Sequence, residues 1–110
     1  MSAPLNDVWL PEVEAEYFAL LGLSRDVGAD VGDQFRTFQH LVERGGDASA
    51  RPIERAGSAN VYVRYGSKAL MFYAIAGSQA AVVKWTTLGT DHEQQVAQEQ
   101  AMQRAAQLFP

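Results

Sequence analysis

The chain has 110 residues, of which 47% are hydrophobic and 20% are charged, and its net charge is −4. These values predict one globular domain over residues 1–110 that can bury a core without cross-links. The chain has no cysteine, which excludes disulfides, thiolate metal sites and cysteine nucleophiles. The sequence shows neither a signal peptide nor a run long enough to span a membrane, so we expect a cytoplasmic protein without a membrane partner.

The charges are divided unevenly along the chain. Residues 1–50 carry three Arg against nine Asp and Glu, whereas residues 51–90 carry five Arg and Lys against Glu54 alone. A chain polarised in this way can present one basic face to RNA even though it is acidic overall. Charge alone favours a simpler interpretation, in which the helices carry solvated acids and the sheet carries scattered cations.

The first half of the chain predicts a short strand and a helical hairpin. Residues 7–10 form an apolar run that ends at a proline, as an edge strand can. Apolar side chains at helical spacing predict a helix over residues 12–23. Asp30 is expected to cap a second helix over residues 31–44, which the glycine pair 45–46 ends.

The second half predicts a sheet followed by a helix. Residues 60–89 contain three β-rich runs separated by the Gly-Ser pairs 66–67 and 77–78, which is typical of an antiparallel meander. The middle run, residues 69–76, is apolar at both odd and even positions, so both of its faces should be covered. It should therefore be the central strand of the meander. Residues 52–56 predict a further short strand. A capping box at residues 90–93 predicts the start of a C-terminal helix, and the fold class is therefore α+β.

The sequence contains no standard catalytic motif, and neither His40 nor His92 has a second imidazole at metal-ligand spacing. The acids on either side of His92 point in different directions on a helix and make a poor chelate. We therefore expect no metal and no cofactor. His92 is either a solvated residue in the capping box or a general acid or base, and the sequence favours the solvated residue. Arg64 and Lys84 lie within apolar strands, and if they share a face they could hold a phosphate between them. The alternative is that each cation points to water or pairs with an acid.

Tyrosines of the meander have two interpretations. Tyr65 and Tyr73 could stack on bases, as aromatic side chains do in proteins that bind single strands. Tyrosines in a meander more often pack across strands or in the core.

The order of these segments resembles the RelE/HigB/ParE toxin superfamily, most closely its phage-derived HigB-like branch, over most of the chain from Val8 to Leu108. Members have a first strand, a helical hairpin, a basic loop, a meander and a C-terminal helix. The matching segments here are LVERGG (41–46), RPIERA (51–56), VYVRYG (61–66), ALMFYAIAG (69–77) and AAVVKW (80–85). The resemblance implies an antiparallel meander with an N-terminal helical hairpin and a C-terminal helix, a RelE-like α+β domain.

The resemblance also implies a toxin of a bacterial or phage toxin–antitoxin module, which cleaves mRNA without a metal and is neutralised by an antitoxin protein. The expected partners are the antitoxin and either mRNA or the ribosome, and a homodimer is left open. The residues implied in catalysis are Arg64, Lys68, Lys84, Tyr73 and His92, and those implied in RNA binding are Arg51 and Arg55.

This chain departs from the family at two places that bear on catalysis. An arginine of the family's central strand is replaced by Leu70, and the lysines or arginines that usually follow the last strand are replaced by residues 88–91. These departures support an alternative function, a protein-binding module of the same fold that inhibits a host protein or gyrase without catalysis. A third interpretation is an unrelated α+β domain with the same order of elements.

Overall fold

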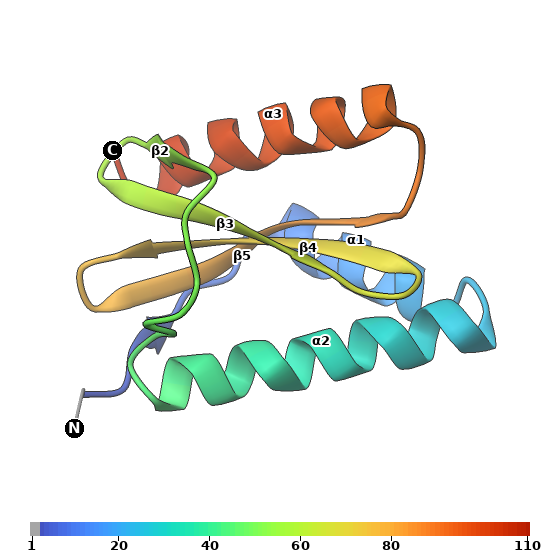
Figure 1. The fold of residues 1–110 in the computed structure, drawn as a ribbon, viewed down its shortest axis with the longest axis horizontal. Helices are drawn as coiled ribbons and strands as arrows, with labels where there is room; N and C mark the ends of the chain where they lie inside the picture. The colour runs from blue at the N-terminus through green and yellow to red at the C-terminus, as the bar shows by residue number, and fades with distance from the viewer. Residues whose placement is uncertain (1–2) are drawn as a thin grey trace.

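A computed structural model describes residues 3–110 as a sheet with helices on both faces (Figure 1). Its strands lie in the order β1-β5-β4-β3-β2; β1 is parallel to β5 and the other neighbours are antiparallel. Helices α1 and α2 cover one face, which we call the hairpin face, and α3 covers the other, which we call the α3 face. The elements are β1 (Asn6–Asp7), α1 (Pro11–Leu21), α2 (Arg25–Glu43), β2 (Glu54–Ala56), β3 (Ala59–Tyr65), β4 (Ala69–Ala76), β5 (Gln79–Thr87) and α3 (Asp91–Leu108).

The predicted α+β class and the predicted order of elements are confirmed. The antiparallel meander is formed by β3, β4 and β5, and β4 is its buried central strand. The short strand expected at residues 52–56 is β2, which joins β3 through an additional Gly-Ser pair at residues 57–58. The first strand is shorter than expected and makes the sheet mixed, because β1 runs parallel to β5. No helix among the described residues is long and apolar enough to cross a membrane.

Each face of the sheet has its own core. On the α3 face, Ala97, Ala101 and Ala105 of α3 pack against side chains that include Phe72 and Val83. Small residues at this spacing let the helix lie close to the sheet, as their pattern predicts. On the hairpin face, the core is built from larger side chains, including Val13, Val31, Phe38, Met71 and Trp85.

The predicted start of the second helix was wrong. Helix α2 begins at Arg25, and Ser24 caps it by accepting a hydrogen bond from the Val27 N–H at 3.2 Å. Asp30 lies in the second turn of this helix and is not its N-cap. Ser24 is followed by residues that can all enter a helix, so the earlier cap starts it one and a half turns sooner.

Asp30 instead binds the turn between β3 and β4. Its Oδ2 accepts hydrogen bonds from the backbone N–H groups of Lys68 at 3.0 Å and Ala69 at 2.9 Å, and Gln34 donates to the Ala69 carbonyl at 2.9 Å. Partial burial opposes ionisation of Asp30, but these backbone donors outweigh it and hold the pKa below its ordinary value of 3.8. A Cβ at Gly66 would collide with the side-chain ends of Asp30 and Gln34. Asp30 and Gly66 therefore depend on each other.

This dependence can be measured with a double-mutant cycle. We expect Gly66→Ala and Asp30→Ala each to lower the free energy of unfolding by about 1–3 kcal/mol. We expect the double variant to lose about 1 kcal/mol less than the sum, because without the carboxylate the added methyl group has only the flexible end of Gln34 to displace. Asp33→Ala, an exposed change in the same helix, controls for helix propensity. Strict additivity in urea unfolding would show that the two residues act independently.

A charged cluster covers the open edge of β5. Because β1 pairs with only Gln79 and Ala80, the rest of β5 has no neighbouring strand on that side. Glu16 of α1 accepts hydrogen bonds from Lys84 Nζ at 2.7 Å, from the Trp85 N–H at 3.2 Å and from both terminal nitrogens of Arg104, at 2.9 and 3.1 Å. Arg104 of α3 also donates to the Val83 carbonyl at 3.0 Å. We call Glu16, Lys84 and Arg104 the edge cluster.

The edge cluster is largely shielded from water. The side chains of Glu16, Lys84 and Arg104 are 21, 14 and 17% exposed. Burial opposes ionisation of Glu16, but the hydrogen bonds from Arg104, Lys84 and the Trp85 N–H outweigh it and lower the pKa of the carboxyl. At neutral pH the cluster therefore contains one carboxylate between two cations, and its net charge is +1.

We expect Glu16→Gln to lower the free energy of unfolding by about 2–3 kcal/mol at pH 7, because two shielded cations lose their anion. The exposed Glu12→Gln in the same helix should change it by less than about 0.5 kcal/mol. The folded pKa of Glu16 lies below its ordinary value of 4.5. The difference in the free energy of unfolding between the native chain and Glu16→Gln should therefore be complete above pH 4.5. It should disappear as the pH falls through the folded pKa of Glu16. Equal stability of the two proteins at pH 7 would contradict a structural role for the cluster.

Candidate functional site

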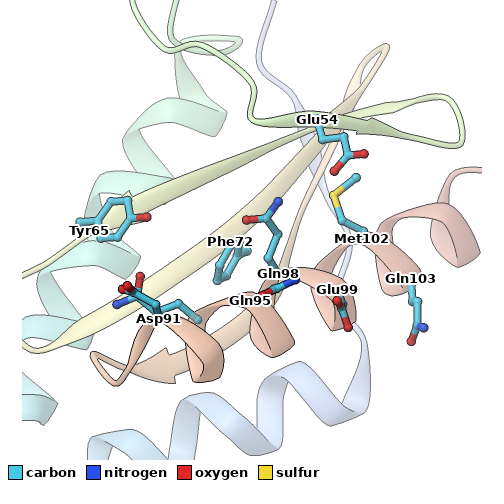
Figure 2. A pocket seen from close by; sticks show the side chains of 10 residues that line it. Glu54, Tyr65, Phe72, Asp91, Gln95, Gln98, Glu99, Met102 and Gln103 are labelled. Carbon is cyan, nitrogen blue, oxygen red and sulfur yellow. The ribbon is translucent and has the colours of Figure 1, made fainter.

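A groove of about 640 Å³ lies between α3 and the outer strands of the sheet (Figure 2). We call it the α3 groove. The sheet contributes apolar and aromatic surface through Phe72 of β4 and Tyr65 of β3, and Glu54 enters from β2. The α3 side contributes mainly polar residues: Asp91, Gln94, Gln95, Gln98, Glu99, Met102 and Gln103.

The periodicity of α3 explains the composition of the groove. The alanines at positions 97, 101 and 105 face the sheet, so the residues beside this stripe line the space between the helix and the strand edge. Gln98 extends from α3 toward Phe72, and Met102 lies near Glu54 at the other end of the groove (Figure 2). The groove therefore has an apolar floor and a wall of flexible amide side chains.

The charge of the groove is negative. Its lining includes the carboxylates of Glu54, Asp91 and Glu99 and contains neither lysine nor arginine. Carboxylates repel phosphate groups and attract ammonium and guanidinium groups. The groove therefore suits a cationic ligand better than a nucleic acid.

The structure does not bring Arg64 and Lys84 together. Arg64 pairs with Met71, which belongs to the core of the hairpin face, whereas Lys84 lies opposite Phe72 of the α3 face. Opposed residues of neighbouring strands project to the same side, so the two cations project to opposite sides of the sheet. The hypothesis of a phosphate held between them was therefore wrong. Lys84 follows the alternative interpretation, since it pairs with Glu16.

A β-bulge accounts for the position of Lys84. Phe72 pairs with Lys84 but the next residue, Tyr73, pairs with Val82, so Val83 is an extra residue in β5. The extra residue changes the alternation of sides along β5. Strict alternation from the sequence therefore gives the wrong side for this lysine.

Tyr73 is a core residue of the hairpin face. Its ring stacks on Tyr62 with centroids 4.9 Å apart and packs edge-on against Phe38 at 6.0 Å. Burial, with smaller contributions from Asp47 and Tyr62, raises the pKa of the Tyr73 hydroxyl to about 12, although Arg64 acts in the opposite direction. Such a hydroxyl is a weak acid at neutral pH, and the enclosed ring offers little surface on which a base could stack.

The other predicted site residues are exposed and dispersed. Lys68 lies in the β3–β4 turn, Arg51 in the loop before β2, and His92 in the first turn of α3. Arg55 lies opposite Asn60 at the outer edge of the sheet. Within residues 3–110, Arg51, Arg55, Arg64 and Lys68 form no ion pair with an acid.

Sequence reasoning missed the residues that make up the α3 groove. Glutamine carries no chemical signature, and the distance between α3 and the strand edge is set by tertiary packing. The available signal was the helical period of α3, which places residues 94, 98 and 102 beside the alanine stripe. Leu70 is fully buried in the core of the α3 face, opposite Tyr65.

Comparison with known proteins gives no relative from which a function of this groove could be assigned. No protein-family model matches the chain, and neither curated proteins nor solved structures give a significant match.

Proposed function

We propose that this chain is the RelE-like member of a toxin–antitoxin pair. It acts by binding a protein in its α3 groove and not by cleaving RNA. The observation that carries this proposal is the charge of the groove: three carboxylates line it and no cation does. A site that cleaves RNA must stabilise a phosphate as it gains negative charge, which requires cationic donors. The α3 groove offers the opposite electrostatic environment.

The family resemblance points to the same region. Leu70, which stands where the family has an arginine, is buried beneath this face and pairs with Tyr65 of the groove. Asp91, which belongs to the stretch that replaces the family's lysines or arginines, lines the groove itself. The first departure therefore places an apolar core residue beneath this face, and the second adds a carboxylate to the lining of the groove.

The lining also supports the chemistry of a protein partner. Phe72, Tyr65 and Met102 provide apolar and aromatic surface of the kind that anchors protein interfaces. Glutamine side chains can donate and accept hydrogen bonds along a peptide backbone. The three carboxylates favour a partner segment that carries lysine or arginine, which would be drawn to the groove and held in register. We therefore expect the partner to present a basic segment.

An mRNA endoribonuclease is the second candidate. It is favoured by Arg64, which is exposed, unpaired within the described residues and close enough to Tyr73 to influence its hydroxyl. Tyr62 lies beside both residues on the hairpin face. Lys84 projects to the other side of the sheet and is paired with Glu16, so it does not add its charge to this surface. Arg64 alone supplies less positive charge than phosphodiester cleavage requires.

Binding of the partner can be tested with the protein encoded next to this chain's gene. We expect the purified pair to form a stoichiometric complex whose affinity falls as the salt concentration rises. The double variant Glu54→Gln and Glu99→Gln should weaken the complex about tenfold, because each lost charge pair contributes about 0.5–1 kcal/mol at a partly exposed interface. The double variant Glu12→Gln and Glu43→Gln removes the same charge outside the groove and should leave the affinity unchanged. Equal weakening by both double variants would contradict binding at the groove.

Cleavage of RNA can be tested by expressing the chain in a bacterium and mapping transcript ends. We expect the native chain and Arg64→Ala to give the same pattern of ends, because Arg64 does not belong to a cationic site. New cleavage sites that appear with the native chain and vanish with Arg64→Ala would overturn the proposal in favour of the endoribonuclease. A catalytically unrelated exposed change, Arg36→Ala, serves as the control for expression level.

A further inference from the structure

The helical hairpin carries a second pocket on the side of the sheet opposite the α3 groove. It has a volume of about 370 Å³ and is lined by Trp9, Glu14, Tyr17, Phe18 and Phe35. We call it the aromatic pocket. Four of its five residues are aromatic, and the fifth is an acid. Phe18 is 60% exposed, so its ring is accessible to a ligand that enters this pocket.

The rings of this pocket are held in place by contacts that the folded chain already makes. Trp9 donates a hydrogen bond from its indole nitrogen to Asp7 at 3.0 Å and stacks on Phe35 with centroids 5.4 Å apart. Tyr17 lies 5.0 Å from Phe35 and 5.6 Å from the buried Trp85. The pocket is therefore formed before any ligand arrives, and a ligand would lose little free energy in ordering it.

The chemistry of the lining selects a cation. The faces of aromatic rings are electron-rich and attract cations that shed water easily, which is why cages of several rings recognise methylated ammonium groups. Glu14 adds a full negative charge at the pocket. Neither lysine nor arginine lines the pocket, and the nearby Arg36 is paired with Asp33.

We propose that the aromatic pocket binds a methylated ammonium group, with Trp9, Tyr17, Phe18 and Phe35 around the cation and Glu14 as its counter-ion. The methyl groups supply the apolar surface that the rings require, and the positive charge distinguishes this ligand from an ordinary apolar side chain. The group can belong to a free quaternary ammonium compound or to a trimethylated lysine of another protein. This site is separate from the α3 groove, so its assignment does not depend on the proposed function.

The decisive comparison uses choline and its neutral carbon isostere, dimethylbutanol, which have nearly the same shape. We expect choline to bind at least about fivefold more tightly, because the isostere lacks the charge that the rings and Glu14 attract. Binding is followed by titration with nuclear magnetic resonance on the indole N–H signal of Trp9, a residue that lines the pocket. A trimethyllysine peptide and its unmodified lysine counterpart are titrated in parallel. The tighter of choline and the trimethyllysine peptide identifies the source of the ligand.

Two variants locate the site and keep the fold intact. Phe18→Leu retains an apolar side chain but removes an exposed ring, and Glu14→Gln retains the shape but removes the charge. We expect them to weaken choline binding about fivefold and about threefold, respectively. Glu12→Gln removes a neighbouring charge that does not line the pocket and should change binding by less than twofold. Equal binding of choline and dimethylbutanol, no binding of any methylated ammonium probe, or unchanged binding in Phe18→Leu would overturn the proposal.

Discussion

The bond between the Glu16 carboxylate and the open edge of β5 is the interaction on which the arrangement of this molecule depends. Glu16 comes from α1 on the hairpin face, whereas Arg104 comes from α3 on the other face, and both bind backbone groups of β5 as well as each other. A two-residue β1 leaves most of this edge without a partner strand. The edge cluster therefore makes hydrogen bonds to backbone groups of β5 that a longer β1 would otherwise bind. It also joins the helices on the two faces across the edge of the sheet.

The edge cluster also determines which charges remain available for function. It engages Lys84 and Arg104, two of the nine lysines and arginines of the chain, and its carboxylate cancels one of their charges. The α3 groove lies toward β2 and β3, and its lining has three carboxylates and neither lysine nor arginine. A chain of this architecture with more cations on the α3 face could bind phosphate there. In this chain the lining of the groove carries carboxylates instead, and these repel phosphate.

The sequence predicted features that depend on neighbouring residues and missed those that depend on distant ones. Gly-Ser pairs between β-rich runs located the meander, and Thr90 caps α3 as its capping box predicts, with its hydroxyl accepting from the Glu93 N–H at 3.1 Å. The Asp30 contact with the β3–β4 turn and the Glu16 contact with Lys84 cross 38 and 68 positions of the chain. An acid in a helix has no local pattern that identifies such a partner. The sequence therefore predicted Asp30 as a cap, and it left open whether Lys84 points to water, holds a phosphate or pairs with an acid. The bulge at Val83 similarly has no signal in a run of apolar residues.

The rotation of α1 links the edge cluster to the aromatic pocket. Successive residues of a helix are separated by about 100°, so fixing the direction of one side chain fixes the others. Val13 points into the core of the hairpin face and Glu16 reaches the edge of β5. Glu14 and Phe18, four residues apart, then share a side of the helix and both line the aromatic pocket. The Trp85 ring packs against Tyr17, and the Trp85 backbone N–H donates to Glu16, so one residue of β5 holds the helix at two consecutive positions. The contact of Glu16 with the edge of β5 thus fixes the direction in which the α1 side chains of the aromatic pocket point.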